Sequence, residues 1–259
     1  MPGYAAELRA KFHPTCPYEG FDYNAYPEDL QGGGGTPMMQ SVFAQLKPKL
    51  VVEVGSWKGV SAIFWARLMK EHNIDGAVVC VDTWLGGLDH ITRPRGEDWT
   101  IRKYFKNGYS TLYYQFLSNI MRLGLQDYIV PIPNSSICGA RWMQYHGLAA
   151  DLVYIDASHE EDDVYADMQA YWKVLKWGGA MLGDDITLAW YPVICAVNRF
   201  AREKELAMQV SPPTWVIQKA MSGDQQAVAN MVNVELGALK DLILSTRKGA
   251  VGKVGVPSA

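Results

Sequence analysis

The feature that most constrains this chain is the alternation of short apolar runs with longer amphipathic stretches between residues 50 and 203. Apolar runs of this length are typical of strands buried on both faces, and the stretches between them have helical spacing. Strands separated by helices predict a parallel sheet covered on both faces. The expected strands are Leu50–Val54, Ala77–Val81, Tyr128–Ile132, Leu152–Ile155 and Ala180–Leu182, and the expected helices are Pro37–Leu46, Val60–Lys70, Thr111–Leu123, Cys138–Tyr145, Asp162–Leu175 and Tyr191–Glu203.

The two ends of the chain depart from this pattern. Residues 1–35 hold scattered prolines and end in a run of four glycines, which predicts an irregular N-terminal extension with a flexible joint. Beyond the alternating region, the runs Leu206–Val210 and Thr214–Gln218 flank two prolines and predict an antiparallel hairpin at the sheet edge. A helix over about Asp224–Leu244 and a loose tail over 245–259 should follow.

Together these patterns predict one α/β domain over residues 36–244. Its fold class is a doubly wound, mostly parallel, seven-stranded Rossmann-like sheet with a C-terminal antiparallel hairpin. In such a sheet, ligands bind beyond the carboxyl ends of the strands. The residues that close each strand are therefore the candidates for a functional site.

Composition excludes several classes of protein. The 259 residues are 49% apolar and 20% charged, which supplies a real core, and 24 Lys and Arg against 27 Asp and Glu leave a net charge of −3. This balance argues against nucleic acid or an anionic membrane as a partner. No apolar run approaches the ~18 residues of a membrane span, and the first residues lack the apolar segment of a signal peptide. The four cysteines are far apart in sequence, which disfavours a zinc site or disulfides and suggests a cytoplasmic protein.

The first strand runs into a glycine-containing turn, Glu53-Val54-Gly55-Ser56-Trp57-Lys58-Gly59. Gly55 allows a sharp turn close to a ligand, and Gly59 allows a helix to begin with its free N–H groups facing that ligand. The spacing does not fit the dinucleotide fingerprint G-x-G-x-x-G, because positions 57 and 60 are not glycine. The turn is either a ligand-binding loop or an ordinary strand–helix connection.

The second strand ends in an acid. A carboxylate at Asp82 has two acceptor oxygens at the spacing of a ribose diol, and Trp84 just after it would cover an adenine face. The alternative for Asp82 is a turn or capping residue. The third strand leads into Pro133–Ser136, whose small polar groups either edge the adenine or cap the next helix.

Three carboxylates follow the fourth and fifth strands. Asp156 closes one strand and the pair Asp184 and Asp185 closes the next, so all three should emerge at one edge of the sheet. They would repel one another unless they were protonated or bridged by a cation, and oxygen ligands suit Mg²⁺. The alternative is that Asp184 or Asp185 caps the next helix and that only one carboxylate faces the cleft.

These segments resemble one enzyme family. The turn Val81–Gly86, the strand end Ile155–His159 and the run Leu175–Asp185 are similar to the methyltransferase family 24 branch of the class I S-adenosylmethionine (SAM) methyltransferases. The resemblance covers about residues 48–186 and implies that the glycine turn cradles the amino-acid part of SAM. The cofactor-binding residues expected on this basis are Glu53, Gly55, Ser56, Gly59, Asp82, Thr83, Trp84, Ser135 and Asp156.

The resemblance extends to metal-dependent catechol and macrolide-sugar O-methyltransferases. Carried over position by position, it implies that Asp156, Asp184 and Asp185 hold Mg²⁺ and that His159 is the base. The expected function is a SAM-dependent, Mg²⁺-dependent O-methyltransferase acting on a hydroxyl of a sugar, polyol or catechol-like small molecule. The alternatives are a metal-independent small-molecule methyltransferase and a non-catalytic SAM-binding protein.

A long connection between Asp82 and Thr111 is the expected substrate loop, since loops of this length in compact domains are usually lids or binding loops. Arg93 and Arg95 either meet an acidic group of the substrate or face solvent, and His90 either faces the cleft or does not. The expected partner is a small-molecule acceptor such as a sugar or glycoside, and self-association is left open. An aromatic cluster that either lines the substrate pocket or belongs to the core or a dimer contact comprises Tyr104, Phe105, Tyr109, Tyr113 and Tyr114.

Overall fold

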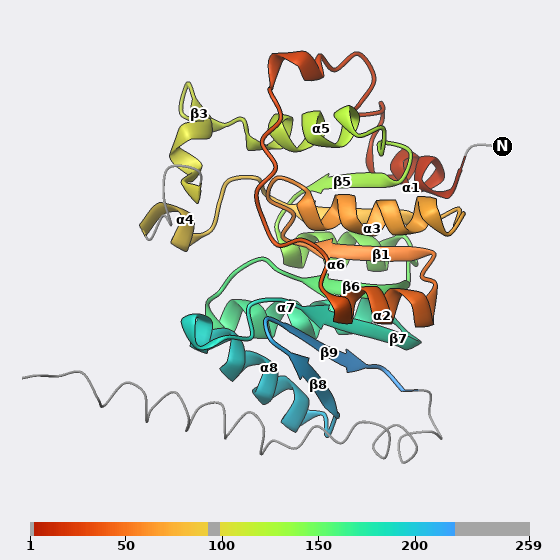
Figure 1. The fold of residues 1–259 in the computed structure, drawn as a ribbon, viewed down its shortest axis with the longest axis vertical. Coiled ribbons are helices and arrows are strands. Elements are labelled where there is room, and N and C mark those ends of the chain that lie inside the picture. Colours follow the sequence, from red (N-terminus) through yellow and green to blue (C-terminus); the bar gives the residue numbers. More distant parts are fainter. Residues whose placement is uncertain (1–2, 93–98, 221–259) are drawn as a thin grey trace, which may run out of the picture.

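The computed structural model describes residues 3–92 and 99–220 (Figure 1). It contains a seven-stranded sheet in the order β5-β2-β1-β6-β7-β9-β8, in which the first five strands are parallel and β9 is antiparallel to both its neighbours. The predicted fold class is thereby confirmed. The strands are β1 (Leu50–Val54), β2 (Ala77–Asp82), β5 (Ile129–Pro133), β6 (Ala150–Ile155), β7 (Leu175–Gly183), β8 (Met208–Ser211) and β9 (Thr214–Gln218), and a separate small ribbon pairs β3 (Phe105–Lys106) with β4 (Tyr109–Ser110).

Helices cover both faces of the sheet because side chains alternate across it. Val52 and Val54 of β1 face one core with α1, α6, α7 and α8, whereas Val51 faces a second core with α2, α3 and α5. The helices are α1 (Tyr4–Phe12), α2 (Pro37–Leu46), α3 (Val60–Glu71), α4 (Leu88–Thr92), α5 (Leu112–Arg122), α6 (Ser136–Tyr145), α7 (Glu161–Val174) and α8 (Tyr191–Glu203), with the short 3₁₀ turns η1 (Tyr23–Ala25), η3 (Ile101–Tyr104) and η4 (Leu188–Trp190). Within the described ranges, no helix is both long and apolar enough to cross a membrane.

The N-terminal region differs from its prediction as an irregular extension. Its first part forms helix α1, whose buried face of Ala5, Leu8 and Phe12 packs on the core beside the sheet. The spacing of these three residues is helical, but the prolines that follow them obscure the pattern. The expected helix Asp224–Leu244 and the tail 245–259 lie outside the described residues, as do Arg93 and Arg95.

The strand register brings the candidate site together. Strands β2, β1, β6 and β7 end nearly level, so Asp82, Gly55, Asp156 and Asp184 emerge at one edge of the sheet. The paired residues that fix this alignment are Val81 with Val54, Val54 with Ile155, and Ile155 with Gly183. Helix α4 and the β3–β4 ribbon lie beyond the arrowheads of β1 and β5 at this same edge (Figure 1).

Candidate active site

Two adjoining cavities open at the carboxyl edge of the strands. The first, called here the acidic cavity, has a volume of about 290 Å³, and the second, called the adjoining cavity, has about 330 Å³. Both are near the lower end of the size range of small-molecule sites. The residues that line both of them are Gly55, Trp57, His90, Asp156 and Ala157.

The turn after β1 forms the boundary between these cavities. Gly55 has φ +85°, and a Cβ added there would lie 2.0 Å from the carbonyl oxygen of Asp156. Only glycine therefore fits at this position, which explains the first glycine of the sequence motif. Ser56 lines the acidic cavity, whereas Glu53 and Gly59 of the same motif line neither cavity.

Asp82 holds this turn in place. Its Oδ2 accepts hydrogen bonds from the backbone N–H groups of Ser56 and Trp57, both at 2.8 Å, and its Oδ1 accepts from the N–H of Trp84 at 2.7 Å. Asp82 also lines the adjoining cavity. A carboxylate has about four lone-pair sites, so three backbone donors leave little capacity for a ribose. Asp82 thus acts in the turn, and its contact with a ribose stays a prediction.

The structure corrects the role that the sequence predicted for Trp84. Its side chain is 1% exposed, packs on Tyr113 and Phe116 in the core and lines neither cavity, so it does not cover a ligand there. The reason is local: its Nε1 donates to the carbonyl of Trp57 at 2.9 Å, which turns the indole inward. Trp57 lines both cavities instead, and its ring stacks on His90 with ring centroids 4.1 Å apart.

The far side of the adjoining cavity contains the other expected cofactor residues. Thr83 and Ser135 both line it. The Ser135 hydroxyl also accepts from the N–H of Cys138 at 3.3 Å, so this serine caps α6 while facing the cavity. Both readings of the third strand end are therefore compatible with the structure.

Glu53 is buried beneath the turn. Its side chain is fully buried. Burial raises the pKa of Glu53 to about 8, although the hydroxyl groups of Ser56 and Ser61 act in the opposite direction. A carboxyl group in this state is either neutral or compensated by a cation.

The three carboxylates converge in the acidic cavity, as predicted, and all of them line it. Burial and the charges of Asp184 and Asp185 raise the pKa of Asp156 to about 8, and the pKa of Asp184 is also raised, chiefly by burial. One oxygen of Asp184 accepts from the Tyr154 hydroxyl at 3.3 Å, while its Oδ1 is buried without a partner in the described parts of the chain. Asp185 adopts φ +61°, in the left-handed region that few non-glycine residues occupy and in which Asp is enriched.

His159 lies between two acids on the wall of the acidic cavity. Its Nε2 is 2.8 Å from Asp185 Oδ2, its Nδ1 is 3.3 Å from Asp89 Oδ2, and its ring stacks on Trp190 with centroids 3.9 Å apart. Burial lowers the pKa of His159, but the hydrogen bonds and charges of Asp185 and Asp89 outweigh it and raise that pKa to about 9. One ligand atom from each of Asp156, His159 and Asp185 lies within 4.8 Å of the others, a spacing that allows a shared metal ion.

Several residues of the acidic cavity escaped the sequence analysis. Gln31, Gly32 and Gly33 line it from the N-terminal region, and Asp89 and Trp99 line it from the long connection after β2. Only the length of that connection pointed to the second group. The aromatic cluster that could have lined the pocket or belonged to the core or a dimer contact lines neither cavity. Tyr104 and Tyr113 pack in or against a core, and Phe105, Tyr109 and Tyr114 are exposed.

Comparisons with known proteins identify the family and the fold. A family model described as a methyltransferase domain matches residues 52–186, and no curated protein matches the sequence. Among solved structures, the O-methyltransferase from Bacillus cereus in complex with SAH has 16% identity and a TM-score of 0.51, with 73% of this chain and 84% of that chain covered. The O-methyltransferase TomG from Streptomyces achromogenes, in complex with SAM, has 11% identity, coverage of 71% and 78%, and a TM-score of 0.51. The O-methyltransferase NovP has 15% identity, coverage of 82% and 93%, and a TM-score of 0.51. At these identities the likeness shows a shared fold.

Proposed function

Because the chain belongs to the methyltransferase-domain family, as the match over residues 52–186 shows, we propose that it transfers the methyl group of SAM to a hydroxyl oxygen of a small molecule with the help of a divalent cation. The observation that carries this proposal is the convergence of three carboxylates and His159 in a cavity that adjoins a second one along the glycine turn. The three similar structures have the same fold and are O-methyltransferases by name, which makes a hydroxyl the acceptor to test first.

The adjoining cavity fits SAM. The chain turns sharply at Gly55, where a Cβ would overlap the backbone of Asp156, and the hydroxyl-bearing residues Thr83 and Ser135 line the same cavity. Asp82 fixes the backbone of Ser56 and Trp57, so the turn is ordered before a ligand enters. Such preorganisation lowers the entropy cost of binding.

The acidic cavity fits a divalent cation. Asp156, Asp184 and Asp185 would hold it, since their oxygens are ligands that Mg²⁺ and Mn²⁺ prefer and Asp184 Oδ1 is buried without a partner among the described residues. When bound, such an ion lowers the pKa of a hydroxyl and orients it. It would also offset the mutual repulsion that raises the pKa of Asp156.

His159 is the proposed base. Its ring lies on the cavity wall, held by stacking on Trp190 and by the carboxylate of Asp89. Only the neutral ring can act as a base, and a cation on Asp185 would favour that form because it offsets one of the two carboxylates that raise the pKa of His159. In that form His159 would take the proton of the acceptor hydroxyl while the methyl–sulfur bond breaks and the methyl–oxygen bond forms. The products are the methyl ether, the demethylated cofactor and the proton on His159.

The walls of the acidic cavity favour a polyhydroxylated acceptor. Trp57, Trp99 and Trp190 contribute indole rings to its lining, and Gln31 and Asp89 contribute polar groups. Apolar faces combined with hydrogen-bonding groups suit a sugar ring or glycoside better than a catechol, which has oxygens at one end alone.

A methyl-transfer assay tests the proposed function. Radiolabelled SAM would be incubated with the protein, Mg²⁺ and a panel of probes comprising methyl β-D-glucopyranoside, myo-inositol and catechol, with and without EDTA. We expect a methyl ether on a sugar or cyclitol, loss of activity in EDTA and recovery with Mg²⁺ or Mn²⁺. The variant His159→Ala should lower kcat by about 10²–10⁴-fold, the usual contribution of a positioned base. Full activity in excess chelator would contradict the cation's role, and a variant within threefold of wild type would remove His159 from the mechanism.

A further inference from the structure

We propose that Lys58 and Asp29 are positioning residues for the acceptor: their ion pair fastens the segment 27–36, called here the strap, along the acidic cavity and turns the amide of Gln31 toward the acceptor. The identity of the acceptor in this proposal rests on the proposed function, whereas the fastening of the strap by the ion pair is independent of it.

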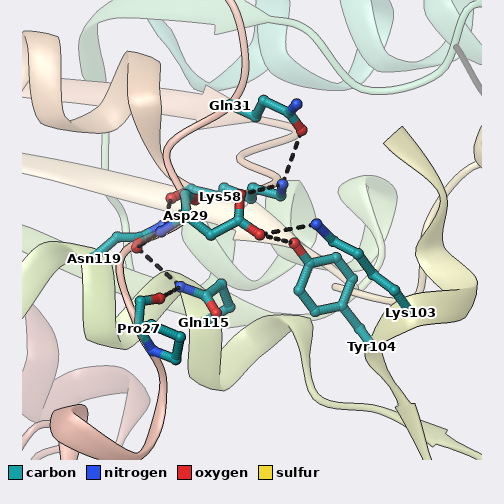
Figure 2. A network of polar contacts seen from close by, with 8 residues as sticks. All are labelled: Pro27, Asp29, Gln31, Lys58, Lys103, Tyr104, Gln115 and Asn119. Carbon is teal, nitrogen blue, oxygen red and sulfur yellow. Dashed lines mark hydrogen bonds and ion pairs between the residues drawn. The ribbon is translucent and has the colours of Figure 1, made fainter. Parts of the chain in front are cut away.

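Lys58 supplies the first observation. Its side chain is fully buried, and its Nζ lies 2.7 Å from Asp29 Oδ1 and 2.9 Å from Gln31 Oε1 (Figure 2). A buried lysine is destabilising unless it is paired, and an apolar residue of similar volume is often at least as stabilising as a buried ion pair. Lys58 belongs to the turn between β1 and α3, so this charge links the cofactor side of the site to the strap.

Asp29 is the point at which three segments meet. While Oδ1 binds Lys58, Oδ2 accepts from the Tyr104 hydroxyl at 2.5 Å and lies 3.1 Å from the Lys103 Nζ (Figure 2). Burial alone would raise the pKa of Asp29, but the hydrogen bonds from Lys58, Tyr104 and Lys103 lower it. Tyr104 and Lys103 lie in η3, at the end of the long connection that supplies Asp89 and His90 to the acidic cavity. One carboxylate therefore ties together segments from three walls of that cavity.

Helix α5 holds the base of the strap independently of this charge. The Nδ2 of Asn119 donates to the carbonyl oxygens of Asp29 and Lys58, both at 2.9 Å, and its Oδ1 accepts from the N–H of Asp29 at 3.2 Å. Gln115 donates to the carbonyl of Pro27 at 2.7 Å (Figure 2). These bonds do not involve the Lys58 side chain. A variant at Lys58 should therefore fold while releasing the part of the strap that follows Asp29.

The strap passes close to the proposed metal ligands. A Cβ added to Gly33 would lie 2.9 Å from Asp184 Oδ2, and one added to Gly35 would overlap the ring of Phe64 at 1.9 Å. Gly33 and Gly35, in the run expected from the sequence to be a flexible joint, thus approach side chains closely, whereas a Cβ added to Gly34 would meet nothing within 4 Å. A strap displaced by an ångström or two would change the shape of the acidic cavity.

The orientation of Gln31 follows from the chemistry of lysine. An ammonium group donates and never accepts, so the Gln31 atom facing Lys58 must be the carbonyl oxygen. The two N–H groups of the amide then point away from Lys58, and Gln31 lines the acidic cavity. They are placed to donate to an oxygen of the acceptor, away from the hydroxyl that receives the methyl group.

The fastening is tested without an acceptor by NMR relaxation of the glycine amides 32–35. Wild type should give order parameters near 0.85, the value of rigid backbone, and Lys58→Met should lower them below about 0.6. The control is Lys176→Met, which breaks a 2.6 Å ion pair to Asp151 beside the start of β6, at the opposite edge of the sheet, and should leave these amides rigid. Unchanged glycine order parameters in folded Lys58→Met would overturn the proposal.

The positioning role is tested with the probe acceptors of the assay above. Lys58→Met and Gln31→Leu should each raise the KM for a methylated probe at least tenfold while the KM for SAM stays within threefold of wild type, and Gln31→Leu should leave the glycines rigid. An unchanged acceptor KM in Gln31→Leu would overturn the role of Gln31. Failure of wild type to methylate any probe counts against the proposed function, and the glycine order parameters still decide whether Lys58 fastens the strap.

Discussion

At the residue scale, the partners of each acid determine what that acid can do. Asp82 accepts three backbone hydrogen bonds and orders a turn, whereas Asp156 faces two other carboxylates, so it is either protonated or balanced by a positive charge. The two are alike in sequence, since each directly follows an apolar strand. Their roles differ because Asp82 is surrounded by N–H donors and Asp156 by negative oxygens.

Replacing Asp82 with Ala should weaken cofactor binding. The change removes acceptors for the N–H groups of Ser56 and Trp57, which loosens the turn, and it removes any bond to a ribose. Hydrogen bonds to a charged group contribute about 1.5–3 kcal/mol, which corresponds to roughly 10–150-fold in the Kd for SAH. Titration calorimetry measures this value, with the exposed Asp127→Ala as control. Unchanged affinity in Asp82→Ala would show that neither the turn nor the ribose depends on this carboxylate.

Asp167 should make stability depend on pH. Its side chain is 3% exposed, and burial together with the charge of Asp163 raises its pKa to about 6. Between about pH 4 and 6 the folded protein keeps a proton that the unfolded chain releases, so this group's contribution to stability falls as pH rises. Relative to wild type, Asp167→Asn should gain about 1–3 kcal/mol between pH 4.5 and pH 7.5, from 1.36 kcal/mol per unit of pKa. Urea unfolding gives the free energy of unfolding of both proteins at each pH. A difference between them that stays constant from pH 4.5 to pH 7.5 would contradict the raised pKa of Asp167.

At the scale of elements, the local sequence pattern was sufficient to predict those strands and helices whose buried residues follow one regular spacing. The bounds of β1, α2 and α8 agree with the sequence prediction, because an apolar strand or a strongly amphipathic helix has no competing local structure. Strand β7 was predicted too short, since Trp177 and the two following glycines do not resemble a buried strand, yet the strand begins at Leu175.

The candidate site likewise contains residues that the sequence could predict and residues that it could not. The acids at strand ends were predictable, because the edge at which they emerge follows from the parallel sheet alone. Gln31, Asp89 and the stacking of Trp57 on His90 were not, because loop segments from distant parts of the sequence bring them to the cavity. Trp84 was predicted to face the cofactor, but its ring packs in the core, because its orientation depends on a hydrogen bond to the carbonyl of Trp57.

Helix α1 should contribute to stability as an integral part of the domain. Leu8 is 1% exposed within the main core, so Leu8→Ala should destabilise the protein by about 2–5 kcal/mol, the usual cost of such a truncation. The exposed Lys11→Ala on the same helix should change stability by less than about 0.5 kcal/mol. Chemical denaturation compares the two variants. Equal, small effects would mean that α1 is not packed on the sheet in solution.

At the scale of the whole molecule, segments remote in sequence meet at one edge of the sheet. The strand ends supply Asp156, Asp184 and Asp185, the long connection after β2 supplies Asp89 beside His159, and the strap closes the remaining side. The two cavities share Gly55 and Trp57 of the glycine turn. The proposed reaction would use this arrangement to bring a methyl donor in one cavity beside an acceptor in the other, with a cation balancing the three acids.

The proposed cation site is tested most directly by a Mn²⁺ titration followed by electron paramagnetic resonance, which needs no acceptor. We expect one bound Mn²⁺ per chain in wild type, at least a tenfold loss of affinity in Asp156→Asn and in Asp184→Asn, and near-normal binding in His159→Ala, because the histidine is proposed as base and not as ligand. Displacement of the Mn²⁺ by Mg²⁺ should be complete. Absence of stoichiometric binding in wild type, or binding that Asp156→Asn leaves unchanged, would rule out a cation held by these acids.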